Sequence, residues 1–273
     1  MVKETKESIE IPSNNSYPSR ILGLDISTAC IGATIIYDDG VNEPKIEKIT
    51  HIAPKISSKI KNSIESLILK KEIFENEFLN DLKNSGITEC VIEAPLIFAL
   101  GNSNPTTVAQ LLKFNALLSE AVYHTLGIIP YYISSLNARI YAFPELLGVR
   151  KFNKSGEMYD AKHILKDINT NHIVPFADFS FDCDKKNVIM NIVCDKYPEI
   201  TWVYNKKGDF KKENFDACDS LVCALSYSNI KRYGELDCHI SNYSIDKSEN
   251  GELLTYNISF WDKTIEKNIK LKI

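Results

Sequence analysis

Long apolar runs are absent from this 273-residue sequence, and no stretch of about 18 consecutive apolar residues exists to form a membrane-spanning helix. The opening segment, MVKETKESIEIPSNN, mixes charges of both signs with polar residues where a signal peptide needs an apolar centre. Glycine and proline are scarce, at 11 and 10 residues, which excludes a collagen-like chain. We therefore expect a globular protein of the cytoplasm or nucleus, with no membrane partner.

Closely spaced cysteines are missing as well. The seven cysteines are scattered, and no C-x-x-C pair or Cys/His spacing typical of a zinc site occurs. We interpret them as reduced, mostly buried thiols. There is no basic excess either, because 36 acidic residues outnumber 32 basic ones and the formal net charge is −4. The overall charge therefore gives no indication of a nucleic-acid partner.

Short apolar runs and helical periodicities alternate along the chain. Short runs typical of strands occupy residues 20–30, 31–40, 43–53, 87–95 and 128–134. Apolar residues at helical spacing occupy 57–83, 106–126, 135–147, 184–197 and 215–231. The order begins with a three-stranded meander and continues as βαβα, which predicts an α/β fold with a mixed sheet flanked by helices.

Composition divides the chain into three parts. Residues 1–19 are rich in Ser, Asn and Pro and predict a mobile tail. Residues 20–233 are predicted to form one domain with an insertion at about 155–183, a stretch too long for an ordinary connection. Residues 234–273 predict a C-terminal β-hairpin extension, completed by a lysine-rich last strand.

Two carboxylates occur where the sequence is otherwise apolar. Asp25 interrupts the first strand, where an ionised carboxylate must be neutralised, paired or metal-bound. Hydrogen bonding to nearby backbone is an equally good explanation for Asp25 alone. Glu93 ends the apolar strand before Ala94 and Pro95, and it can also simply turn to solvent.

A second pair of carboxylates lies in NFDACDSLVCAL. Asp216 and Asp219 are three residues apart, so they project from one face of the predicted helix. Asn214 is a candidate N-cap, and acidic residues are favoured in a first helical turn by the helix dipole alone. If the first and fourth strands are neighbours beneath this helix, four carboxylates converge. Such a set suits a pair of Mg²⁺ or Mn²⁺ ions and phosphodiester cleavage.

The segments GLDIST, VIEAP and DACD resemble the ribonuclease H-like superfamily, and within it the RuvC-like Holliday junction resolvases. The resemblance implies a mixed five-stranded sheet with the first and fourth strands adjacent. It implies two Mg²⁺ or Mn²⁺ ions per site, held by the catalytic residues Asp25, Glu93, Asp216 and Asp219. It also implies an endonuclease that resolves four-way DNA junctions by paired nicks. Because such a junction has twofold character, we expect a homodimer, with residues 106–126 as the interface.

DNA contacts are expected from a locally basic region and from one aromatic residue. Phe98 is the candidate wedge at the branch point that the resemblance implies, although a Phe packed in the core beneath that loop is the more common arrangement. The basic candidates near the insertion are Arg139, Lys151, Lys154, Lys185 and Lys186. Solvated surface lysines are the alternative, and the next candidates are Lys206, Lys207, Lys211 and Lys212.

Other classes of protein remain open. A sugar kinase or ATPase of the actin-like superfamily also carries an Asp on its first strand. That class favours D-x-G-[ST], whereas this chain has Asp25-Ile26-Ser27-Thr28, and it needs a second glycine-rich phosphate loop that is missing here. A catalytically inactive module would be expected to lose a carboxylate. A related nuclease acting on other branched DNA or on RNA/DNA hybrids is not distinguished by these motifs.

Overall fold

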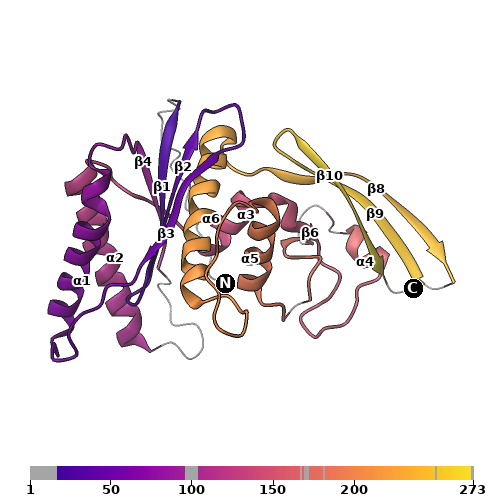
Figure 1. Cartoon of the computed structure of the whole chain (residues 1–273). Coiled ribbons are helices and arrows are strands. Elements are labelled where there is room, and N and C mark those ends of the chain that lie inside the picture. Colours follow the sequence, from indigo (N-terminus) through magenta and orange to yellow (C-terminus); the bar gives the residue numbers. More distant parts are fainter. Residues whose placement is uncertain are drawn as a thin grey trace, which may run out of the picture. The chain divides into compact units, whose positions relative to one another are not determined.

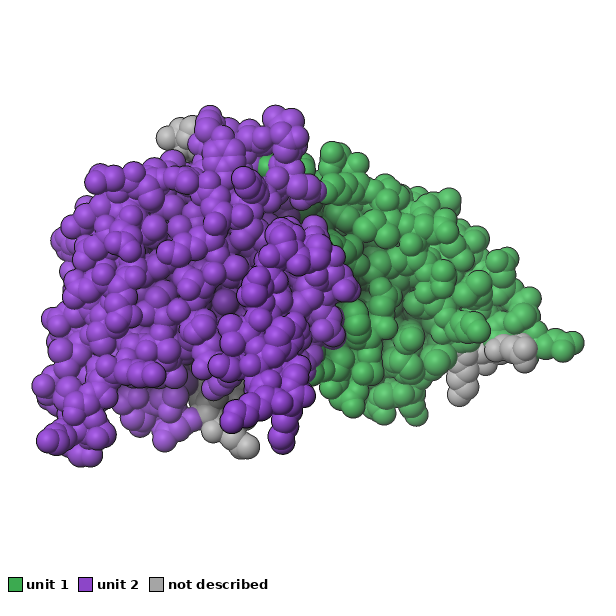
Figure 2. Space-filling view, in the orientation of Figure 1, with its two compact units in different colours: residues 1–13, 143–185, 230–273 green, residues 14–142, 186–229 purple. Residues whose placement is uncertain are grey.

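The computed structural model describes residues 17–95, 104–166, 168, 172–180, 182–249 and 251–271. The chain separates into two compact units, coloured differently in Figure 2. The large unit comprises residues 14–142 and 186–229. The small unit includes residues 143–185 and 230–273. The three-part division at residues 19/20 and 233/234 stays a prediction.

The large unit is built on a mixed five-stranded sheet. Its strands are β1 (Ser19–Ile26), β2 (Ile31–Asp38), β3 (Lys45–Ile52), β4 (Glu89–Glu93) and β5 (Tyr131–Ile133), in the order β3-β2-β1-β4-β5. β1 pairs with β2 antiparallel and with β4 parallel. The predicted ribonuclease H-like arrangement, with the first and fourth strands adjacent, is confirmed.

One face of this sheet is apolar and carries two helices, α1 (Ser63–Glu77) and α2 (Pro105–Leu126) (Figure 1). Leu22 and Leu24 of β1 join one buried cluster with Phe74 of α1 and Leu118 of α2. The 3₁₀ turn η1 (Leu79–Leu82) follows α1. The first helix starts at Ser63 rather than at residue 57, because the Asn62 side chain caps it there by accepting two backbone N–H groups.

The buried face of α2 bears on the predicted dimer interface. Phe114, Leu118 and Val122 are buried in the core of the large unit. Leu112 and Tyr123 keep 39% and 50% of their surface exposed. A dimer formed through α2 would therefore have to use this second, more polar face.

The opposite face of the sheet is covered by α6 (Lys212–Tyr233), which Figure 1 shows across the sheet from α1 and α2. Two glycines allow the helix to approach closely. A Cβ atom on Gly23 would lie 2.2 Å from the backbone oxygen of Ser220, and one on Gly32 would lie 1.9 Å from that of Asp216. Thr34 adds a hydroxyl contact of 2.8 Å to Ser220. The sequence of β1 and β2 thus determines where α6 packs.

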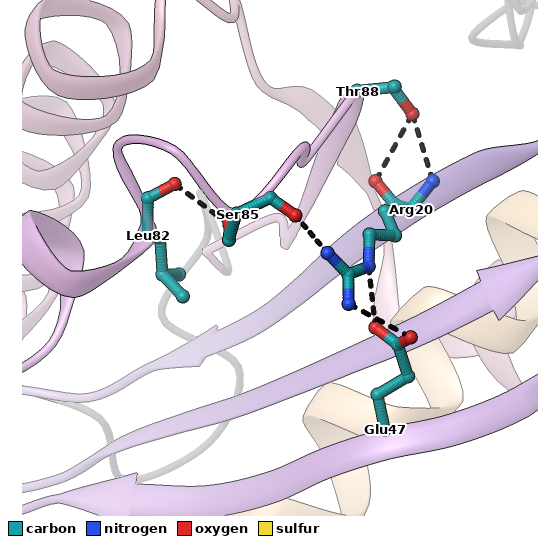
Figure 3. Close-up of polar contacts among 5 residues, drawn as sticks. All are labelled: Arg20, Glu47, Leu82, Ser85 and Thr88. Atoms are coloured by element: carbon teal, nitrogen blue, oxygen red, sulfur yellow. Dashed lines mark hydrogen bonds and ion pairs between the residues drawn. The ribbon is translucent and has the colours of Figure 1, made fainter.

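Arg20 organises the start of β1 (Figure 3). Its guanidinium donates two hydrogen bonds to Glu47 of β3, at 2.7 and 3.0 Å, and a third to the Ser85 carbonyl. Its backbone N–H donates to the Thr88 hydroxyl at 3.0 Å. These bonds tie the segment before β4 to β1 and so help to set the parallel register that aligns Leu24 with Ile92.

Helices α3 (Ser135–Ala142) and α5 (Lys185–Lys196) complete the set near the predicted site. α5 agrees with the helix predicted over 184–197, so Lys185 and Lys186 lie in its first turn and not in the basic loop that the family resemblance implies before this helix. One local prediction was wrong. Asn214 lies inside the first turn of α6 rather than at its N-cap, because the helix already starts at Lys212.

The small unit combines short elements with a second sheet. The 3₁₀ turn η2 (Pro144–Leu146), β6 (Leu147–Val149), α4 (Ala161–Lys166) and β7 (Ile173–Pro175) come first. β8 (Cys238–Ser248), β9 (Gly251–Phe260) and β10 (Lys263–Leu271) then form an antiparallel sheet in the order β10-β9-β8. The buried Tyr256 hydroxyl accepts the Val149 N–H at 2.9 Å, so the two parts are joined. No helix in the described part of the chain has the length and apolarity to cross a membrane.

Candidate active site

Asp25 and Glu93 lie beside one another on adjacent parallel strands. The register pairs Leu24 with Ile92, so the next residues along β1 and β4 are the two acids. Strand side chains alternate between faces, so Asp25 shares the face of Gly23, the one that α6 covers. Glu93, which follows Ile92 of the apolar cluster, lies on that same face. The two carboxylates therefore project toward α6.

Helix α6 brings the other two carboxylates to this point. Asp216 and Asp219 are only 8% and 5% exposed. Gly32 pairs with Asp25 across β1 and β2, and the backbone of Asp216 packs directly on Gly32. The close approach of α6 thus places its acidic face over the end of β1.

The carboxylates perturb one another electrostatically. Burial raises the pKa of Asp25 well above its usual value, and the charges of Glu93, Asp219 and Asp216 raise it further, against Lys186. Burial also raises the pKa of Glu93 to about 7, with Asp219 adding to the effect and Arg139 opposing it. At neutral pH these carboxylates hold their full negative charge only at a cost in free energy.

Two cationic side chains share the Asp219 carboxylate. Arg139 of α3 lies with a guanidinium nitrogen 3.6 Å from one oxygen, and Lys186 of α5 lies with Nζ 3.2 Å from the other. The Arg139 side chain is 14% exposed and that of Lys186 is 53% exposed. Four carboxylates thus face two cations, and protons or a divalent cation would balance the remaining charge.

Cys30 is a member of the site that the sequence analysis did not single out. It directly precedes β2, two residues before Gly32, and its thiol is hydrogen-bonded to Asp216. Burial, followed by the charge of Asp216, raises the pKa of Cys30 to about 12, so the thiol stays protonated. The signal in the sequence was the alternation of Cys30, Gly32 and Thr34 along a strand next to Asp25.

The arrangement of the four carboxylates differs from that of a preformed metal site. Among the residues described here, no three His, Cys, Asp or Glu side chains have the arrangement needed to hold a metal ion. Asp219 instead contacts Arg139 and Lys186, and Asp216 is hydrogen-bonded to Cys30. The donor chemistry nevertheless fits a hard divalent cation, since every candidate ligand is a carboxylate oxygen.

The other predicted DNA-binding residues belong to the small unit or lie outside the described residues. Lys151, Lys154 and Lys185 belong to the small unit. Lys151 lies over the ring of Phe152 at 5.4 Å, and Lys185 lies over that of Phe176 at 5.8 Å. Phe98 lies outside the described residues. Of the predicted basic residues, the structure brings Arg139 and Lys186 to the carboxylates.

No protein-family model matches the sequence, and no curated protein matches it. Among solved structures, the chain is similar to Thermus thermophilus RuvC, both alone and in complex with a Holliday junction substrate. Each comparison has a TM-score of 0.44 and 12% identity, and covers 79% of this chain and 96% of RuvC. It is also similar to the yeast mitochondrial Holliday junction resolvase Ydc2, with a TM-score of 0.41, 12% identity and coverage of 81% and 82%.

Proposed function

We propose that this chain is a metal-dependent endonuclease that resolves four-way DNA junctions by paired nicks. One observation carries the proposal, namely that a sheet of ribonuclease H-like order gathers four carboxylates on one face. These residues are Asp25, Glu93, Asp216 and Asp219. Paired divalent ions held by carboxylates are a recurrent device for phosphodiester cleavage.

The charge balance supports a divalent cation at this site. Raised pKa values for Asp25 and Glu93 mean that the metal-free protein holds surplus negative charge that it tends to neutralise with protons. A bound Mg²⁺ or Mn²⁺ ion supplies neutralising charge and a Lewis acid that lowers the pKa of a coordinated water. Asp219 would join the ligands by turning from Lys186, which contacts it in the metal-free protein.

The two cations have different parts in this proposal. Arg139 is mostly enclosed, so it acts by holding Asp219 in place from α3. Lys186 keeps about half of its side chain in solvent, and its ammonium group is already at the carboxylates. It is therefore suited to contact the non-bridging oxygens of a scissile phosphate.

Paired nicking requires two such sites related by a twofold axis, because the opposed strands of a four-way junction are related in this way. A homodimer is therefore part of the proposal. Its interface is proposed on the exposed face of α2, with Leu112 and Tyr123.

The experiment is a cleavage assay with Mg²⁺ on four end-labelled substrates: a mobile four-way junction, a Y-fork, a linear duplex and an RNA/DNA hybrid. We expect symmetrical nicks in the junction and little cleavage of the linear duplex. Equal cleavage of the fork would indicate general selectivity for branched DNA, and cleavage of the hybrid alone would indicate a ribonuclease H activity. Failure to cleave any substrate, with the Asp25→Asn protein as blank, would reject the proposal.

A further inference from the structure

A tight hairpin, residues 203–211, immediately precedes α6. Asn205 and Asp209 are joined by a backbone hydrogen bond of 2.8 Å, and Gly208 takes a positive φ of 88° at the turn. The Asn205 side-chain oxygen accepts the N–H groups of Lys207 and Asp209, and its amide donates to the Asp209 carboxylate at 3.1 Å. These contacts fix the tip of the hairpin from within.

The same hairpin occurs a second time, in the small unit. Asn153 and Glu157 are joined by a backbone bond of 2.8 Å, and Gly156 has a φ of 80°. The Asn153 side chain makes the equivalent bonds to Ser155 and Glu157. Both copies follow one pattern, with an aromatic residue, Asn, Lys, any residue, Gly, an acid and an apolar residue. In each copy the lysine after the asparagine, Lys154 or Lys206, is exposed at the tip.

The first hairpin is fastened to the helix that carries the catalytic aspartates. Asn214 in the first turn of α6 donates to the Val203 carbonyl at 2.6 Å and accepts the Val203 N–H at 3.2 Å. The Phe210 ring packs on that of Phe215, with centroids 6.3 Å apart. Asp216 directly follows Phe215 in sequence, so the hairpin and the site are held on one rigid segment.

The exposed chemistry of this hairpin suits nucleic acid. Lys206 and Lys207 are exposed at a tip that loses little further freedom on binding. The Tyr204 ring is 52% exposed and stacks on Phe210 at 5.1 Å, which leaves it supported on one side. Residues 203–213 contain four lysines and two acidic residues, Asp209 and Glu213, so the segment has a net positive charge.

We infer that the hairpin 203–211 is a DNA-binding element of the proposed nuclease. Lys206 and Lys207 contact backbone phosphates, and Tyr204 stacks on a base that is unstacked at the branch point. This inference rests on the proposed function in one respect, because it takes branched DNA as the ligand. It goes beyond that function by assigning the contacts to a segment outside the carboxylate site.

The test measures binding of a fluorescent four-way junction in EDTA, where cleavage does not interfere, over a series of salt concentrations. We expect Lys206→Gln/Lys207→Gln to reduce the slope of log affinity against log salt by about two, since each lost phosphate contact removes roughly 0.9. Tyr204→Leu should weaken binding roughly fivefold or more, whereas Tyr204→Phe should bind like wild type because it keeps the ring.

The matched control is Lys59→Gln/Lys61→Gln, which removes two lysines from the segment before α1, on the opposite face of the sheet. It should leave the slope unchanged. A slope for Lys206→Gln/Lys207→Gln equal to that of wild type would overturn the inference, as would wild-type protein that does not bind the junction. The proposed function is tested separately, because wild-type protein that binds through the hairpin but never nicks DNA would reject nuclease activity and leave the DNA contact standing.

Discussion

Glu93 makes the stability of the metal-free protein depend on pH in a direction that can be worked out. Its pKa is raised from 4.5 to about 7 in the folded protein, mainly by burial. Between these two pH values the folded state binds more protons than the unfolded state, so the free energy of unfolding falls as pH rises. The shift of about 2.5 pH units corresponds to about 3 kcal/mol, lost in full above about pH 7.

The perturbation that tests this reasoning is Glu93→Gln, which keeps the size of the side chain and removes its charge. At pH 8 in EDTA the variant should be more stable than wild type by about 3 kcal/mol. At pH 4.5 the two proteins should be nearly equal, because Glu93 is then protonated in the folded protein. Urea unfolding followed by circular dichroism across pH 4.5–8 measures the difference, and Glu72→Gln on the exposed surface of α1 is the matched control.

Magnesium should reduce the stability difference between Glu93→Gln and wild type at pH 8. At pH 8, Mg²⁺ should stabilise wild type by mass action and stabilise Glu93→Gln much less, since a ligand charge is missing. If the variant and wild type differ in free energy of unfolding by the same amount at every pH, the raised pKa of Glu93 would be refuted. A variant less stable than wild type at pH 8 would do the same.

Three further predictions concern the site. Asp25→Asn should slow nicking by about 10³-fold or more while junction binding is kept, and activity within about tenfold of wild type in a junction-nicking assay would remove Asp25 from the site. Mg²⁺ or Mn²⁺ should support nicking and Ca²⁺ only binding; full activity in EDTA would contradict the mechanism. Gly32→Ala should destabilise the protein by about 1–3 kcal/mol or more and impair nicking, because its Cβ would meet the Asp216 carbonyl at 1.9 Å. Urea unfolding measures this loss, and an alanine variant as stable as wild type would show that α6 does not depend on that contact.

The strand order was implied by the family resemblance, whereas the four carboxylates were predictable because they leave local marks in the sequence. Asp25 and Glu93 interrupt or end short apolar strands, where ionised groups are costly. Asp216 and Asp219 are three residues apart on an apolar helix, which places them on one face. Each of these signals is contained within about ten residues, but their convergence at one site depended on the strand order that the resemblance implied.

Features that depend on tertiary contacts were missed. Asn214 was predicted as an N-cap, but the hairpin before it offers the Val203 backbone groups, and its side chain bonds there instead. Lys186 was predicted as a DNA contact, but its contact with Asp219 from the first turn of α5 was not foreseen. The alternation of Cys30 with Gly32 and Thr34 was the one sign of its role, and the packing of α6 on Gly32 is what brings Asp216 to it.

The packing of α6 on Gly23 and Gly32 affects how the protein folds during its synthesis. The four carboxylates come from residues 25, 93, 216 and 219, so the proposed site depends on contacts spanning most of the chain. During synthesis the sheet can form before α6 has left the ribosome, but two of the four carboxylates are then missing. An incomplete chain therefore lacks two of the four carboxylates, and under the proposed function it could cleave DNA only after α6 has packed on the sheet.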